Sequence, residues 1–175
     1  MLTYRLADSL PREVVEKLLA PADRNDVKAE TRRHIETYLD AGHGACWLAR
    51  PVVARIVRDA WLHFNRQRYL LHAWVIMPNH VHLIVEESPD FPLREIVHSW
   101  KSFSVKEANR VLGRTGAFWQ REYWDRFIRH RAHYDSSLSY IYDNPVKAGL
   151  VDDVARWKWS SWNKRTDGSG RARRD

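Results

Sequence analysis

The chain has 175 residues, and its 29 lysines and arginines outnumber 22 acidic residues, giving a formal net charge of +7. This length fits one domain with a buried core, and the excess of cations favours an anionic partner such as nucleic acid. A single cysteine excludes an internal disulfide, and neither a signal peptide nor an apolar run of membrane-spanning length is present. We therefore expect a cytoplasmic protein with no membrane role.

The first part of the chain predicts one strand and three helices. Residues 2–6 alternate in polarity as a strand does, and residues 11–19 can form a helix opened by Pro11. Residues 25–44 predict a second helix with solvated charges, which we expect to be scaffold; its modest apolar side comprises Ile35, Tyr38 and Leu39. Residues 51–65 predict a third helix with an apolar stripe at 3.6-residue spacing.

The middle and end of the chain predict a small sheet with more helices. Residues 69–77 and 80–87 flank a Pro-Asn turn signal and predict an antiparallel hairpin. A helix over 93–112 and a strand over 124–129 should follow. The last predicted helix starts at residue 131 and should end near Asn144, because a residue before proline avoids the α region. This order favours an α+β domain in which helices cover the sheet.

We expect one folded domain over residues 1–163. The ending, residues 164–175, is glycine-rich and basic and lacks large apolar residues, so it predicts a disordered tail or an arm that contacts phosphates.

Two histidines stand in the strand-like stretch MPNHVHLIV, residues 77–85. Side chains two residues apart on a strand point to the same face, so His80 and His82 can reach one metal ion. The alternative is a pair of solvated histidines on an edge hairpin without function.

The last predicted helix has one continuous polar face. His133, Ser137, Tyr140 and Asn144 fall at i, i+4, i+7 and i+11. Most tyrosines on such a helix are half-exposed amphipathic residues. Tyr140 differs because Asn144 lies one turn away, and the amide oxygen of Asn144 could bind a metal ion beside the phenol.

Taken in order, MPNHVHLIV and the later SYIYDNPVKAGLV resemble the REP-associated tyrosine transposases, a branch of the single-tyrosine HUH transposases. LDAGHGACWL, PVVARIV, VHSWKSF, GAFWQREYWDRFIR and WKWSSW extend the resemblance over most of the chain. It implies a ferredoxin-like or RRM-like antiparallel sheet with helices packed on it, of the HUH endonuclease type. It also implies that His80, His82 and Asn144 hold Mg²⁺ or Mn²⁺ and that Tyr140, rather than Tyr142, is the nucleophile.

The implied activity is that of a metal-dependent transposase or nickase on single-stranded DNA. It would cleave and rejoin hairpin-forming REP-type repeats through a 5′-phosphotyrosine intermediate. A divalent cation would neutralise charge on the phosphodiester, and a phenol with a pKa of about 10 needs help to lose its proton. The phosphotyrosine conserves the bond energy, so no nucleotide cofactor is expected.

Two alternative functions are compatible with the sequence. One is a domesticated, non-catalytic protein that binds DNA or RNA hairpins, and the other is a metal-dependent phosphodiesterase that uses water as its nucleophile. A monomer and a homodimer are both open.

Several residues are candidates for contacts with DNA. Arginine and lysine side chains can contact phosphates, and an exposed tryptophan can stack on bases; the candidates are Lys101, Trp119, Arg126, Arg129 and Lys147. Three other tryptophans fit apolar stripes and are expected in the core: Trp61, Trp74 and Trp100.

Overall fold

The computed structural model describes residues 1–11, 13–14 and 34–162. Its elements are β1 (Leu2–Arg5), η1 (Trp47–Ala49), α3 (Pro51–His63), β2 (Tyr69–Ile76), β3 (His80–Glu87), α4 (Leu93–Leu112), β4 (Trp124–Asp125), α5 (Arg131–Lys147) and η2 (Val154–Arg156). Residues 34–40 are also helical. Most of the helix predicted at 11–19 and the tail predicted at 164–175 lie outside the described residues.

Four antiparallel strands form one sheet in the order β2-β3-β1-β4. The hairpin predicted from the Pro-Asn turn is β2 and β3, and β1 pairs with the other side of β3. In that register Thr3 lies opposite His82, and Arg5 lies opposite His80. The order β1-α3-β2-β3-α4-β4, with this arrangement of strands, confirms the predicted ferredoxin-like α+β fold.

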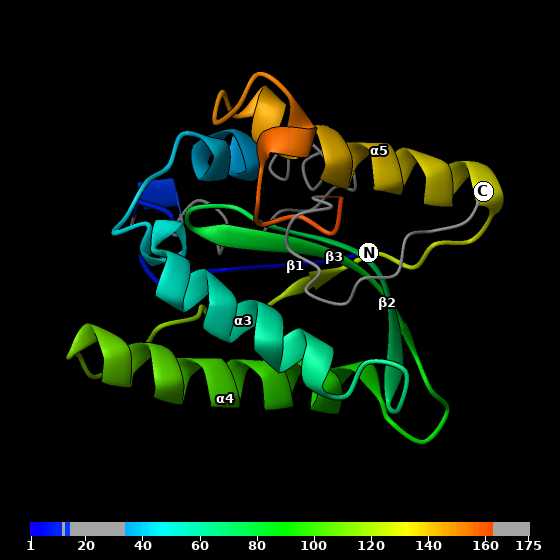
Figure 1. Cartoon of the computed structure of the whole chain (residues 1–175), viewed down its shortest axis with the longest axis horizontal. Coiled ribbons are helices and arrows are strands. Elements are labelled where there is room, and N and C mark those ends of the chain that lie inside the picture. Colours follow the sequence, from blue (N-terminus) through cyan, green and yellow to red (C-terminus); the bar gives the residue numbers. More distant parts are fainter. Residues whose placement is uncertain (12, 15–33, 163–175) are drawn as a thin grey trace.

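The alternation of side chains gives the sheet two different faces. Tyr4, Val81 and Leu83 belong to the main core, on the face that α3 and α4 cover (Figure 1). Ile84 belongs to a second cluster on the opposite face, where it packs with Ile141 of α5. His80 and His82 share that second face with Ile84, so the fold places both histidines in the layer between the sheet and α5.

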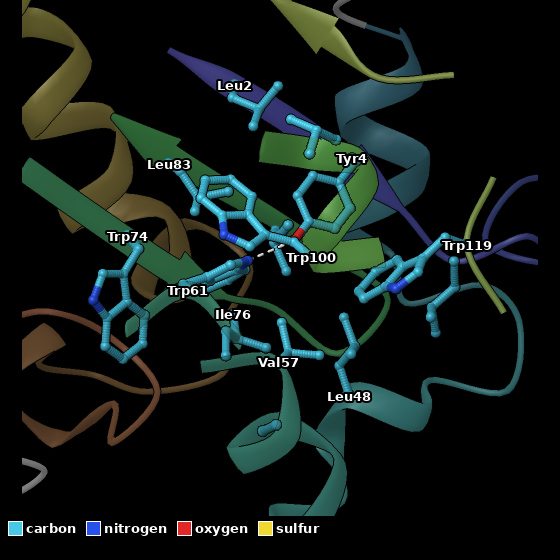
Figure 2. Packing of buried hydrophobic residues seen from close by; sticks show 14 of the residues in the cluster. Leu2, Tyr4, Leu48, Val57, Trp61, Trp74, Ile76, Leu83, Trp100 and Trp119 are labelled. Carbon is cyan, nitrogen blue, oxygen red and sulfur yellow. Dashed lines mark hydrogen bonds between the residues drawn. The ribbon is translucent and has the colours of Figure 1, made fainter. Parts of the chain in front are cut away.

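Tryptophans dominate the main core, as predicted. Trp61, Trp74 and Trp100 are all buried, and the Trp61 indole N–H donates a hydrogen bond of 2.6 Å to the Tyr4 hydroxyl (Figure 2). The Trp100 indole N–H donates in the same way to the Tyr69 hydroxyl, at 2.7 Å. A buried indole N–H needs such a partner, so these aromatic side chains fix the positions of α3 and α4 against the sheet.

Replacing Tyr4 with phenylalanine should destabilise the fold without touching the opposite face. The change removes the oxygen that accepts from Trp61, and leaving a buried donor unsatisfied costs about 1–3 kcal/mol. Urea unfolding should register this loss in the free energy of unfolding. An unchanged midpoint of the urea transition would mean that the hydrogen bond adds nothing to stability.

Two predicted boundaries are wrong. The last helix does not end near Asn144: α5 continues to Lys147 with Pro145 inside it. The helix tolerates Pro145 because its backbone hydrogen bonds resume immediately afterwards. The Ala148 N–H donates to the Asn144 carbonyl at 3.0 Å. The strand predicted at 124–129 is shortened to β4, because only its first two residues pair with β1.

No helix in the described part of the chain is both long enough and apolar enough to cross a membrane.

Candidate active site

His80 and His82 lie side by side beneath α5. Both are 1% exposed, which rules out a solvated pair, and their ring centroids are 4.7 Å apart. β3 is a central strand of the sheet rather than an edge, and this explains the burial. Burial lowers the pKa of His82 to about 3 and, together with the neighbouring His82 ring, lowers the pKa of His80 well below its ordinary value. At neutral pH both imidazoles are therefore uncharged.

Each imidazole has a hydrogen-bond partner that orients its ring. His80 Nδ1 is 2.8 Å from the Asn79 amide oxygen, and since that oxygen can only accept, Nδ1 carries the proton. His80 Nε2 then has a free lone pair. His82 Nδ1 is 2.7 Å from the Thr3 hydroxyl. This hydroxyl can accept a hydrogen bond from the Nδ1–H, and in that tautomer His82 Nε2 is unprotonated, as in His80.

Tyr140 and Asn144 enter the site from α5. The Tyr140 hydroxyl is 3.5 Å from His82 Nε2, and Asn144 follows one helical turn later on α5. Asn144 is 1% exposed, yet its Oδ1 has no hydrogen-bond partner within the described structure. Tyr142 packs instead against Trp162, with ring centroids 4.9 Å apart. Of the two tyrosines, Tyr140 is the one beside the histidines.

The donor atoms of the site suit a divalent cation. The unpartnered, buried amide oxygen of Asn144 suits Mg²⁺ or Mn²⁺, and the two neutral imidazoles are also compatible with Zn²⁺. Histidine, cysteine and carboxylate side chains by themselves form no metal-binding group of three within the described ranges. A cation here would therefore need the oxygen of Asn144 in addition to His80 and His82.

Two carboxylates from helical residues 34–40 also face the site, and the sequence analysis missed them. Asp40 Oδ1 is 3.9 Å from His80 Nε2, and the charge of Glu36 raises the pKa of Tyr140. Their i, i+4 spacing was the available signal, because it places both on one side of a helix. The spacing does not show which element this side of the helix contacts, so the sequence alone predicts that these charges are solvated.

Packing fixes the orientation of this helical segment. Ile35 and Leu39 are buried in a cluster with Leu10, and this turns Glu36 and Asp40 toward α5. Tyr38, expected on the apolar side, is 38% exposed.

The loop after the segment is held at the β2–β3 turn. The Asn79 side-chain amide donates to the His43 carbonyl at 2.9 Å while its oxygen accepts from His80. Gly44 has a φ of +86°, and a Cβ there would collide with the carbonyl of Asp8. One asparagine thus couples the histidine pair to the acidic segment.

Burial and nearby charges alter the pKa values of the phenol and of Asp40. Burial, and then the charges of Glu36 and Asp40, raise the pKa of Tyr140, against the opposing hydrogen bond from Asn144. Burial, and then the charge of Glu36, raise the pKa of Asp40 to about 6. The Lys147 ammonium lies 5.8 Å from the centroid of the Tyr140 ring and is a nearby positive charge.

Two residues predicted as DNA contacts have structural roles instead. The Lys101 ammonium donates to the carbonyls of Gln120, Arg121 and Glu122 at 2.9–3.1 Å, which uses all three of its protons. Trp119 is 7% exposed, and its indole N–H donates to the Ser104 hydroxyl at 2.8 Å. It belongs to the main core and offers no surface on which a base could stack.

Arg126 and Arg129 line a surface groove of about 600 Å³ at the start of α5. Phe127, which the sequence analysis did not single out, lines the same groove and is 80% exposed. Ser136, which also lines the groove, precedes Tyr140 by four residues, or about 6 Å along the helix.

Two known proteins are similar in sequence to more than half of this chain. A REP-associated tyrosine transposase of Escherichia coli (strain K12) is 32% identical over 114 residues, which make up 63% of this chain. A protein of Haemophilus influenzae is 34% identical over 99 residues, 51% of this chain. The matched regions span 65% and 56% of the lengths of these relatives.

A solved structure of a REP-associated tyrosine transposase, described as bound to a REP hairpin, has the same fold. It superimposes with a TM-score of 0.57 at 21% identity, over 92% of this chain and 74% of the other. The family model for IS200-like transposases matches residues 54–144, just over half of the chain. The chain therefore belongs to the IS200-like transposase family, and its predicted resemblance to REP-associated tyrosine transposases is confirmed.

Proposed function

We propose that this transposase is a metal-dependent enzyme that cleaves and rejoins single-stranded DNA at hairpin-forming, REP-type repeats through a 5′-phosphotyrosine intermediate. The observation that carries the proposal is the Tyr140 hydroxyl 3.5 Å from His82 Nε2, one helical turn from buried Asn144, whose Oδ1 has no hydrogen-bond partner within the described structure. A hairpin substrate is supported by the solved neighbour, which is described as bound to one.

Tyr140 would be the nucleophile, and His80, His82 and Asn144 would hold Mg²⁺ or Mn²⁺. When bound, the cation would offset negative charge on the scissile phosphate and help to orient it. α5 supplies both the phenol and the amide, one turn apart, so the spacing between nucleophile and metal ligand is set by the helix itself. Thr3 and Asn79 hold the two imidazoles in the form that binds metal.

The DNA strand would approach along the groove at the start of α5. Arg126 and Arg129 would contact phosphates, and exposed Phe127 would stack on a base. Lys147 lies at the other end of the site, next to the Tyr140 ring. The net charge of +7 would attract the strand over a longer range.

A covalent adduct is the direct test. The protein is incubated with end-labelled single-stranded hairpin DNA from repeats that flank its own gene, with Mn²⁺ or Mg²⁺, and analysed on a denaturing gel. We expect a slow band that protease digestion removes and that excess EDTA prevents. Hairpin binding without an adduct in either metal would favour the non-catalytic alternative.

A further inference from the structure

The Asp40 carboxylate lies beside the histidine pair, at the end of the helical segment 34–40. Its Oδ1 is 3.9 Å from His80 Nε2, which is too long for a hydrogen bond. The Asp40 side chain is 29% exposed, and no lysine or arginine of the described residues forms an ion pair with it. The contact with His80 therefore needs an explanation other than an ordinary hydrogen bond or surface ion pair.

His80 presents a lone pair to this carboxylate, not a proton. The Asn79 side-chain amide donates to the His43 carbonyl at 2.9 Å, and this bond turns the Asn79 oxygen toward His80 Nδ1 at 2.8 Å. Nδ1 therefore carries the proton of the neutral ring. A ring that is 1% exposed and adjacent to His82 is disfavoured as an imidazolium. Two electron-rich atoms thus face each other, and their repulsion is relieved when a positive charge lies between them.

The separation of these two atoms suits two ligands of one cation. For bonds of about 2.1 Å, two ligand atoms lie about 3.0 Å apart at a right angle and about 4.2 Å apart when they are opposite. The distance of 3.9 Å falls within this range. A carboxylate also adds negative charge to a donor set that is otherwise neutral, and Mg²⁺ and Mn²⁺ favour such oxygen ligands.

We propose that Asp40 is a carboxylate ligand of the divalent cation at His80, His82 and Asn144, bound directly or through one water. This inference rests on the proposed function, because it assumes that a cation binds there. His80, His82 and Asp40 by themselves form no metal-binding group within the described ranges, so Asp40 adds to Asn144 and does not replace it. The family match does not assign Asp40, which lies outside residues 54–144.

The fold holds Asp40 beside His80 from two directions. Asp40 is the last helical residue of its segment, and the burial of Ile35 and Leu39 fixes the rotation of that segment. The loop that follows is bonded to Asn79, the same residue that orients His80. The negative end of the helix dipole also lies at Asp40, so a carboxylate there is stabilised by a cation.

Binding of Mn²⁺ to the full chain, without DNA, tests the inference, and the EPR signal of free Mn²⁺ measures the Kd. Asp40→Asn keeps the size of the side chain and one oxygen but removes its charge. We expect the Kd for Mn²⁺ to rise by about 10–100-fold, the usual cost of losing a group that supports a metal site. Asp59→Asn is the matched control and should keep the wild-type Kd, because Asp59 pairs with Arg58 on α3, across the sheet.

A second measurement separates metal binding from a structural role. Imidazole ligands suit Zn²⁺, whereas carboxylates suit Mn²⁺ and Mg²⁺. Asp40→Asn should therefore weaken the binding of Mn²⁺ more than that of Zn²⁺, and the ratio of the two Kd values should change by about tenfold. A variant that only loosens the site would weaken the binding of both ions alike.

The outcomes are distinguishable. Wild-type protein that binds no Mn²⁺, or binding that survives His80→Ala, overturns the proposed metal site and this inference with it. If wild type binds Mn²⁺, His80→Ala abolishes the binding and Asp40→Asn binds as tightly as wild type, Asp40 is not a ligand while the proposed function stands. Equal weakening of Mn²⁺ and Zn²⁺ binding in Asp40→Asn would also overturn the inference.

Discussion

Replacing Tyr140 with phenylalanine is expected to abolish the covalent protein–DNA adduct while leaving hairpin binding intact. The substitution removes one oxygen and keeps the ring, which packs at the margin of the cluster around Ile141. Without that oxygen there is no nucleophile beside His82, and catalysis by a group that acts in a covalent step is lost almost completely. Gel analysis of the adduct and a filter-binding assay on the same protein measure the two effects separately.

Tyr142→Phe is the matched control, since Tyr142 packs against Trp162 and does not contact the histidines. It should form the adduct at the wild-type rate. Strand cleavage that survives in Tyr140→Phe would contradict the tyrosine mechanism and favour the phosphodiesterase that uses water. Loss of the adduct in Tyr142→Phe alone would mean that the wrong tyrosine was chosen.

The sequence predicted the site where local periodicity determines geometry. His80 and His82 are two apart on a strand and face one way, and Tyr140 and Asn144 are one turn apart on a helix. These relations hold within single elements, so spacing alone reveals them. The ferredoxin-like sheet came instead from the family resemblance, which the strand order confirms.

The sequence could not predict contacts that depend on how elements pack. Glu36 and Asp40 lie about a hundred residues before Tyr140, and nothing local shows that their charges act on it. The internal hydrogen bonds of Lys101 and Trp119 were hidden for the same reason, because their partners come from other segments. The sequence also could not predict that Phe127 is exposed, because an aromatic residue between arginines can be either buried or exposed.

Acid should destabilise the metal-free protein through its buried histidine pair. The ordinary pKa of 6.5 falls to about 3 for His82, because of burial, and His80 is also lowered by burial and by its neighbour. Below pH 6.5 the unfolded chain therefore binds more protons than the folded chain. The free energy of unfolding should fall as pH decreases toward 3, by about 1.4 kcal/mol per pH unit for His82, and His80 should add to the fall.

Asp40 should oppose part of this effect. Its pKa is raised from 3.8 to about 6, so between these values the folded chain binds a proton that the unfolded chain does not. Its contribution to stability increases as pH falls. Between pH 6 and 4, Asp40 therefore offsets part of the slope that the histidines produce.

Urea unfolding in EDTA at a series of pH values measures this slope. Asp40→Asn should steepen it, and the double substitution of His80 and His82 by glutamine should flatten it. The slope identifies the titrating groups even where a variant is less stable overall, because it measures the number of protons bound on unfolding and not the energy of lost contacts. If neither variant changes the slope, the histidines are not held neutral by burial, and the site would lack the free imidazole nitrogens that the proposed cation requires.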